Sequence, residues 1–182
     1  DKEFLRQIKF VNTLDSDTQL PRDTARKRIG IATHPLNRPH FDEKLQRVTK
    51  GYGILQPRVS ISLTTASRSY FARIFSGNTG IDPYTTASSD VYQDLFGEGS
   101  FTGKGLYEVD AFAAALKGRV PDNSVLSHDL FEGLYARCGL VTDIELLDDF
   151  PTHFDTFAKR SHRWVRGDWQ IADWILPRIK TE

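Results

Sequence analysis

The sequence predicts a single α/β domain over residues 1–182, because short runs typical of strands alternate with runs typical of helices. Hydrophobic residues make up 39% of the chain and aromatic residues 12%, which is enough to form a buried core. Acidic side chains stand directly after two of the apolar runs, where α/β proteins commonly place their reactive groups. The chemistry of the chain is therefore expected at these strand ends.

Composition excludes several classes of function. Lysine plus arginine equals aspartate plus glutamate at 24 each, so no net charge is available to attract nucleic acid or anionic lipid. The single cysteine, Cys138, cannot form an internal disulfide and is expected to be a small buried side chain. No apolar run approaches the roughly 20 residues that span a bilayer. We therefore expect this stretch to be soluble and to bind no nucleic acid.

Residues 8–14 mix Ile, Phe, Val and Leu and are expected to form a buried strand. Pro21 suits the first position of a helix, which can continue from Arg22 to Thr33 before the next proline interrupts it. The following segment, 34–50, combines prolines with many charges and is interpreted as an exposed loop.

Segment 53–63 is extended in character, although Pro57 suits a central strand only where the strand contains a bulge. Residues 68–75 are expected to form a short helix with apolar side chains on one side. Another short helix is expected at 111–116, with Asp110 as its cap.

Residues 125–126 form a short apolar approach to a polar pair, His128 and Asp129, and a helical run then continues to Gly139. This pattern predicts a strand end followed by a helix start, with a carboxylate at the junction. In that position Asp129 is expected to act as a general base. A plain N-cap, with Glu132 reaching back as in a capping box, is the alternative that the local sequence favours.

Residues 141–147 are a further strand candidate, and 154–175 are expected to be helical with a break near Gly167. Within that helix Arg160 and Arg163 lie one turn apart and can face the same anion. The planar fork of a guanidinium suits a diphosphate. A solvated basic helix face is the alternative.

Asp15 and Asp17 form a D-x-D motif at the end of the first strand. Carboxylates separated by one residue in an extended chain project to the same side, so both can face one cation. Their hard oxygens suit Mg2+ or Mn2+, with phosphate oxygens as further ligands. A turn in which both residues cap the next helix is the alternative.

The glycine-dense stretch 97–105 matches neither the P-loop nor the dinucleotide-binding pattern. Glycine tolerates tight bends and close approach of the backbone to a ligand, so the loop is expected to line a substrate through Gly103 and Lys104. A purely structural loop explains the glycines equally well.

In chain order these features resemble the processive family 2 type glycosyltransferases of the GT-A fold. The resemblance is closest to the glycosyltransferase domain of bacterial cyclic β-1,2-glucan synthases, glycosyltransferase family 84. It is carried by six blocks distributed along the chain: 14–23, 34–39, 51–59, 90–112, 126–140 and 162–170.

The resemblance assigns a role to each matching residue. Asp15 and Asp17 match the D-x-D that engages the metal and the sugar-nucleotide diphosphate, with Mg2+ or Mn2+ implied as the cofactor. Asp129 matches the base, and Arg163 with Trp164 matches the end of the Q-x-x-R-W motif that holds the diphosphate and lines the acceptor channel.

The sequence departs from the family 2 pattern at two places. Ser127 and His128 replace Thr-Glu before the base, and Arg160 replaces Gln. Arg160 keeps a hydrogen-bond donor and adds charge. His128 either contacts the substrate or tunes Asp129, and the sequence leaves that choice open.

The implied reaction is inverting transfer of glucose from UDP-glucose to a growing β-1,2-glucan. The resemblance also implies that the chain is the acceptor-side half of a GT-A-like domain. It would be a fragment, inactive alone, of a larger enzyme attached through flanking regions to the cytoplasmic face of the bacterial inner membrane.

Two other classes of function compete with this interpretation. A glycoside hydrolase or phosphorylase would pair Asp129 with Glu98 or Glu132 across a glycosidic bond. A non-catalytic carbohydrate-binding module would use the tryptophans as stacking platforms.

Overall fold

The computed structural model of the chain describes residues 2–77, 90–120, 123–125 and 129–175. Its main sheet has four strands in the order β1-β5-β4-β6. Their bounds are β1 Phe10–Asn12, β4 Ile54–Ile61, β5 Leu106–Glu108 and β6 Cys138–Asp148. β4 and β6 run parallel, whereas β5 is antiparallel to both β1 and β4. The predicted α/β class with a mixed sheet and flanking helices is confirmed.

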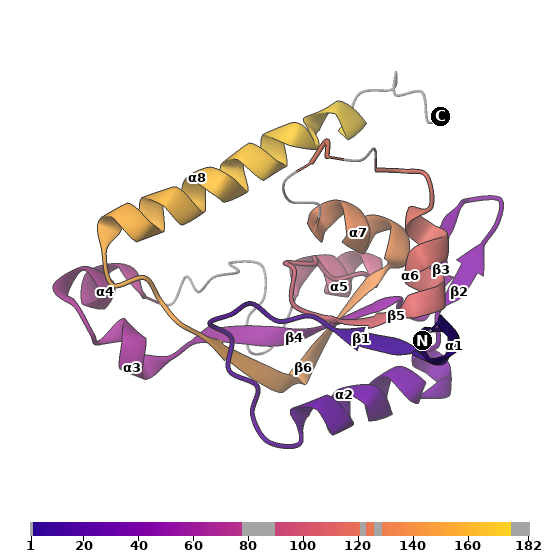
Figure 1. Cartoon of the computed structure of the whole chain (residues 1–182), viewed down its shortest axis with the longest axis horizontal. Coiled ribbons are helices and arrows are strands. Elements are labelled where there is room, and N and C mark those ends of the chain that lie inside the picture. The colour runs from indigo at the N-terminus through magenta and orange to yellow at the C-terminus, as the bar shows by residue number, and fades with distance from the viewer. Residues whose placement is uncertain (1, 78–89, 121–122, 126–128, 176–182) are drawn as a thin grey trace.

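Helices cover both faces of this sheet (Figure 1). They are α1 Lys2–Leu5, α2 Thr24–Thr33, α3 Leu63–Ala66, α4 Tyr70–Phe75, α5 Val91–Phe96, α6 Val109–Leu116, α7 Asp129–Ala136 and α8 Phe154–Gln170, with 3-10 turns η1 Pro35–Asn37 and η2 Ala172–Ile175. α2 lies against one face, and α6 and α7 lie on the other, below the long α8 in this view.

The two faces hold separate apolar clusters because successive side chains of a strand point to opposite sides. Leu55 belongs to the cluster that includes Ala32 of α2. Its neighbour Ile54 belongs to the other cluster, with Ala136 of α7 and Phe101 of the glycine-rich loop. The sheet is therefore buried on both sides, as expected for strands enclosed between helices.

Pro57 lies at the centre of the sheet, in the strand between β5 and β6. The pairing of β4 with β6 jumps from Pro57–Val141 to Arg58–Glu145, so residues 142–144 form a bulge in β6. Proline has no backbone N–H to donate to a ladder, and a break in register at that point accommodates it. The bulge expected from Pro57 is confirmed.

The prediction of an exposed loop at 34–50 was wrong. This segment contains η1 and a β-hairpin, with β2 at His40–Asp42 and β3 at Arg47–Lys50. The hairpin is anchored by few apolar side chains: Val48 is fully buried, and Phe41 packs against the α6–α7 cluster. Its remaining residues are largely polar and charged, which concealed the strands in the sequence.

Other predicted bounds also need correction. The strand expected at 8–14 is limited to β1, an edge strand with a partly exposed surface. Glu108, rather than Asp110, caps α6, because its carboxylate accepts a hydrogen bond from the backbone of the first turn. The last helix continues through Gly167 and ends at Gln170.

Gly53 supplies a test of how closely β4 approaches the end of α7. A Cβ atom at Gly53 would lie 2.5 Å from the carbonyl oxygen of Ala136, which already accepts a 2.8 Å hydrogen bond from the Gly53 amide. Both groups are backbone, so Gly53→Ala should lower the free energy of unfolding by about 1–3 kcal/mol, measured by urea denaturation. Gly30→Ala, in α2 with open space around it, is the control and should raise that free energy by about 0.5–1 kcal/mol. Equal effects of the two substitutions would contradict the close approach.

Candidate active site

The glycine-rich loop before β5 lies directly against Asp129. A Cβ atom at Gly103 would lie 3.0 Å from Oδ2 of Asp129, and the φ angle of Gly103 is +97°. The hydroxyl of Thr13 holds the loop by donating to the carbonyl oxygen of Gly103 and accepting from the amide of Gly105, each at 3.2 Å. Glycine is therefore required at position 103 for both conformation and space.

Asp129 is the first residue of α7. Residues 126–128, and with them the predicted site residue His128, lie outside the described part of the chain, and Val125 before them is not in a strand. The helix predicted after Asp129 is present. The strand predicted before it is not seen at Val125.

The hydroxyl of Tyr107, which lies in β5, interacts with carboxylates of α7. This hydroxyl donates a 3.3 Å hydrogen bond to Oε2 of Glu132. Burial raises the pKa of Tyr107, and the charges of Glu132 and, more weakly, Asp129 raise it further. Glu132 is itself buried, so Asp129 stands beside an enclosed polar group rather than in bulk solvent.

Lys104 joins the glycine-rich loop to two acidic segments. Its Nζ lies 2.8 Å from Oδ2 of Asp15 and 3.0 Å from Oδ2 of Asp148. Lys104 and Asp148 are almost fully buried, whereas the side chain of Asp15 is 61% exposed. Burial by itself would lower the pKa of Lys104, but the hydrogen bond to Asp15 and the charge of Asp148 outweigh it, and that pKa is raised. Lys104 is therefore a buried cation between two carboxylates.

Arg160 of α8 faces the same acidic groups. Partial burial lowers its pKa, while the charges of Asp17 and then Asp148 oppose that shift. Its guanidinium carbon lies 5.0 Å from the centre of the Trp164 ring, a geometry that permits a cation–π contact. The charge of Arg163 also acts on Arg160.

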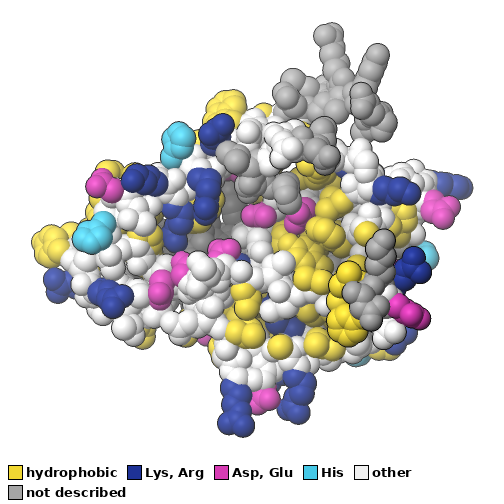
Figure 2. Space-filling view, viewed as in Figure 1, with side chains coloured by type: hydrophobic (Ala, Val, Ile, Leu, Met, Phe, Trp, Pro, Cys, Tyr) yellow, Lys and Arg dark blue, Asp and Glu magenta, His cyan; other side chains and the backbone are white. Residues whose placement is uncertain are grey.

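The basic side of α8 and the D-x-D thus share one neighbourhood. Figure 2 shows acidic side chains in the middle of this face, with basic side chains above and to the left of them, on the side of α8. α8 is held at both ends, because Phe157 packs on Phe150 near its start and Trp174 in the turn that follows packs on Phe131 of α7. This packing fixes the helix across the face that carries Asp129 and Asp15.

The structure connects the predicted site residues that it describes through separate contacts and charge interactions: Asp129 with Gly103, Lys104 with Asp15, and Arg160 with Asp17, Arg163 and Trp164. Their roles stay predictions. Of the three tryptophans, Trp174 packs on α7, Trp169 is largely exposed and Trp164 borders the arginines.

The carboxylates of Asp15 and Asp17 have the hard oxygens that suit Mg2+ or Mn2+. Within the described residues, no group of three or more His, Cys, Asp or Glu is arranged to hold a metal ion. Such sites bind a cation through one or two carboxylates plus phosphate oxygens of the substrate. The donor set fits a cation of this kind, provided that Asp15 is released by Lys104.

Asp148 was not anticipated, although a signal for it existed. It directly follows the predicted strand 141–147 and ends β6, just as Asp15 follows the first predicted strand. Its carboxylate also accepts a 2.6 Å hydrogen bond from Thr18, beside the D-x-D. The rule that identified Asp15, an acid at a strand end, applies to Asp148 as well.

Glu98, one possible second carboxylate in a hydrolase, is engaged elsewhere. It pairs with Arg47 of the hairpin and, at 3.6 Å, with Arg137 at the end of α7. These contacts give Glu98 a structural role.

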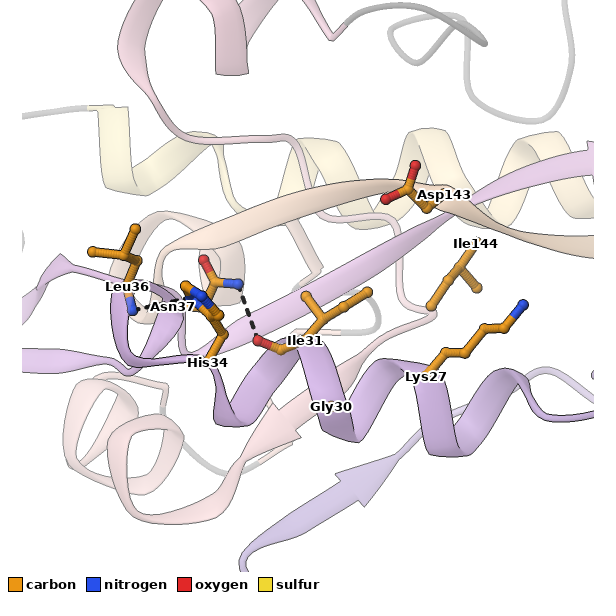
Figure 3. A pocket seen from close by; sticks show the side chains of 8 residues that line it. All are labelled: Lys27, Gly30, Ile31, His34, Leu36, Asn37, Asp143 and Ile144. Carbon is orange, nitrogen blue, oxygen red and sulfur yellow. Dashed lines mark hydrogen bonds between the residues drawn. The ribbon is translucent and has the colours of Figure 1, made fainter.

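Two hollows of the described surface lie away from this cluster. One of about 730 Å³ lies between α2 and β6 and is lined by Lys27, Gly30, Ile31, His34, Leu36, Asn37, Asp143 and Ile144 (Figure 3). Its polar side chains are partly used internally, because Asn37 donates to the carbonyl oxygen of Ile31 and His34 accepts from the amide of Leu36. The candidate site is therefore identified by the charged side chains that lie near Lys104 and not by the volume of a surface hollow.

Comparison with known proteins now bears on these residues. No family model matches the chain. Over 170 residues it is 60% identical to the cyclic beta-(1,2)-glucan synthase NdvB of Rhizobium meliloti (strain 1021). The predicted resemblance to cyclic β-1,2-glucan synthases is confirmed. The match covers 93% of this chain and 6% of NdvB, so the chain is similar to a short segment of that synthase.

Among the described helices, none combines the length and the apolar character that crossing a bilayer requires.

The Lys104–Asp148 pair yields a stability prediction. Lys104→Met leaves the buried carboxylate of Asp148 without its cation and should lower the free energy of unfolding by about 3–5 kcal/mol at pH 8, measured by urea denaturation. The double variant Lys104→Met/Asp148→Asn should recover most of this loss. Because the pKa of Lys104 is raised on folding, its contribution is fully present below the ordinary value of 10.5 and is lost as pH rises through the higher folded value. Additive effects of the two substitutions would show that the pair is not coupled.

Proposed function

We propose that this chain forms the acceptor side of a GT-A-like glycosyltransferase site that builds a β-1,2-glucan from UDP-glucose with inversion. The observation that carries the proposal is the position of Asp129 against Gly103, whose neighbour Lys104 binds Asp15 of the D-x-D. This arrangement links a carboxylate suited to proton transfer with the groups suited to a diphosphate. The similarity to NdvB supports the class of product.

Asp129 would act as the general base. The acceptor hydroxyl oxygen attacks the anomeric carbon of the donor glucose, and the proton of that hydroxyl passes to a carboxylate oxygen of Asp129. As the new C–O bond forms, the bond from the anomeric carbon to the diphosphate oxygen breaks, and its electron pair leaves with UDP. Asp129 begins α7, and because residue 103 is a glycine, no side chain of the loop presses on its carboxylate at that point.

The departing diphosphate needs positive charge on the opposite side of the sugar. Arg163 and Arg160 would supply planar guanidinium donors, and Trp164 beside them would border the acceptor path. A Mg2+ or Mn2+ ion held by Asp15 and Asp17 would add Lewis-acid stabilisation of the same oxygens. The arginines, and a cation held by the acidic pair, would both stabilise the negative charge that develops as UDP leaves.

In this proposal synthesis takes place at the cytoplasmic face of the bacterial inner membrane. NdvB is far longer than this chain, and contacts with the membrane would come from other parts of such a protein.

Replacement of the base should separate chemistry from donor binding. Asp129→Asn keeps the size of the side chain but cannot accept the proton, so glucan synthesis should fall by about 10²- to 10⁴-fold. The measurement is transfer of labelled glucose from UDP-glucose by the protein at its natural length, with UDP binding followed by calorimetry. UDP affinity should stay close to that of the unmodified protein. Undiminished synthesis by the variant would rule out Asp129 as the base, and glucan cleavage without any sugar nucleotide would favour a hydrolase.

Gly103 offers an independent test of the space beside the base. Gly103→Ala places a methyl group against the carboxylate of Asp129 and should reduce glucan synthesis at least tenfold. Gly118→Ala is the matched control, because Gly118 also has a positive φ (+69°) but has open space where the Cβ would be. The control should lose stability through backbone strain while its activity per folded molecule is kept. Equal loss of activity in both variants would mean that strain, not displacement of Asp129, is responsible.

A further inference from the structure

Lys104 is not positioned as an ordinary substrate contact. Its side chain is about 5% exposed, and its ammonium group is enclosed between the carboxylates of Asp15 and Asp148. A substrate phosphate could reach Nζ only after one of these carboxylates had moved. Because the ammonium group is buried, we expect it to act mainly on the carboxylate of Asp15.

A divalent cation bound at Oδ2 of Asp15 would compete with the ammonium group of Lys104 for that oxygen. Oδ2 of Asp15 already lies 2.8 Å from Nζ, whereas Mg2+ binds carboxylate oxygens at about 2.0–2.1 Å. A cation placed on that oxygen would stand within a few ångströms of a buried positive charge, where repulsion is strong because the surroundings screen it poorly. Lys104 must therefore give up this contact when a metal ion takes it.

Asp148 can hold the ammonium group of Lys104 when its contact with Asp15 is lost. Asp148 is 1% exposed and keeps a second contact to the ammonium, and Thr18 holds the other oxygen of the same carboxylate. Lys104 can therefore leave Asp15 without becoming an unpaired buried charge. Asp15, by contrast, lies at the surface and can turn towards solvent.

We propose that Lys104 is a positioning residue that holds Asp15 in the place of a divalent cation, so that Mg2+ or Mn2+ binds there only by displacing Nζ from Oδ2 of Asp15. This proposal rests on the assignment of Asp15 and Asp17 as metal-binding carboxylates in the proposed function. The affinity of the site for a metal ion alone would then be low. It would be higher for a metal ion that binds together with a diphosphate, because the diphosphate offsets the added positive charge.

The test measures binding of Mn2+, without any turnover, by the electron paramagnetic resonance signal of the free ion. The protein at its natural length is compared with Lys104→Met/Asp148→Asn, which removes a neutral pair and leaves no unpaired buried charge. The double variant should bind Mn2+ at least about tenfold more tightly. Lys104→Arg keeps the charge and should stay close to the unmodified protein.

The gain in affinity must depend on Asp15. Adding Asp15→Asn to the double variant should abolish the gain, because the oxygen freed from Lys104 is then neutral. Unchanged or weaker Mn2+ binding in the double variant would overturn the role of Lys104, and so would a gain that survives Asp15→Asn. Thermal unfolding of each variant shows that it is folded. Failure of the transferase proposal would be seen separately, as undiminished synthesis by Asp129→Asn.

Discussion

The parallel pairing of β4 with β6 is the constraint on which the rest of the structure depends. It forms one side of the sheet, lies between the two apolar clusters and brings the carboxyl ends of two strands to one edge. β6 ends there at Asp148, and the strand is further tied to the D-x-D segment by a bridge between Gln19 and Leu147. Every acidic group near Lys104 is therefore placed by the position of β6.

The bulge opposite Pro57 matters to this arrangement. A proline in a central strand interrupts the ladder, and residues 142–144 of β6 absorb the interruption. After the bulge the two strands pair again up to Ile61 and Asp148, so the register at the functional edge is kept. The ladder hydrogen bonds lost at Pro57 therefore leave the position of Asp148, at the end of β6, unchanged.

Electrostatics near the site depend on burial more than on the number of charges. The three positive charges of Lys104, Arg160 and Arg163 balance the three negative charges of Asp15, Asp17 and Asp148, so this part of the site, without Asp129, is neutral. Lys104 and Asp148 are enclosed, and the exposed members of the cluster, Asp15 among them, remain available to a ligand. A neutral cluster with an exposed acidic part suits a ligand that brings a cation and a diphosphate together.

The sequence by itself determined the α/β class and, in outline, the main strands 53–63 and 141–147, because apolar runs are local patterns. Strand-end carboxylates and family motifs are local patterns too, and they identified the candidate site residues, whose roles stay predictions. It did not reveal the β2–β3 hairpin, whose burial rests on little more than Val48 and Phe41, nor the pairing of Glu98 with arginines distant in sequence. Tertiary structure alone decided that Lys104 lies between Asp15 and Asp148 and that Gly103 lies against Asp129. The physical reason is that ion pairing and close backbone approach depend on distances between segments up to about 130 residues apart in the chain, which no local pattern encodes.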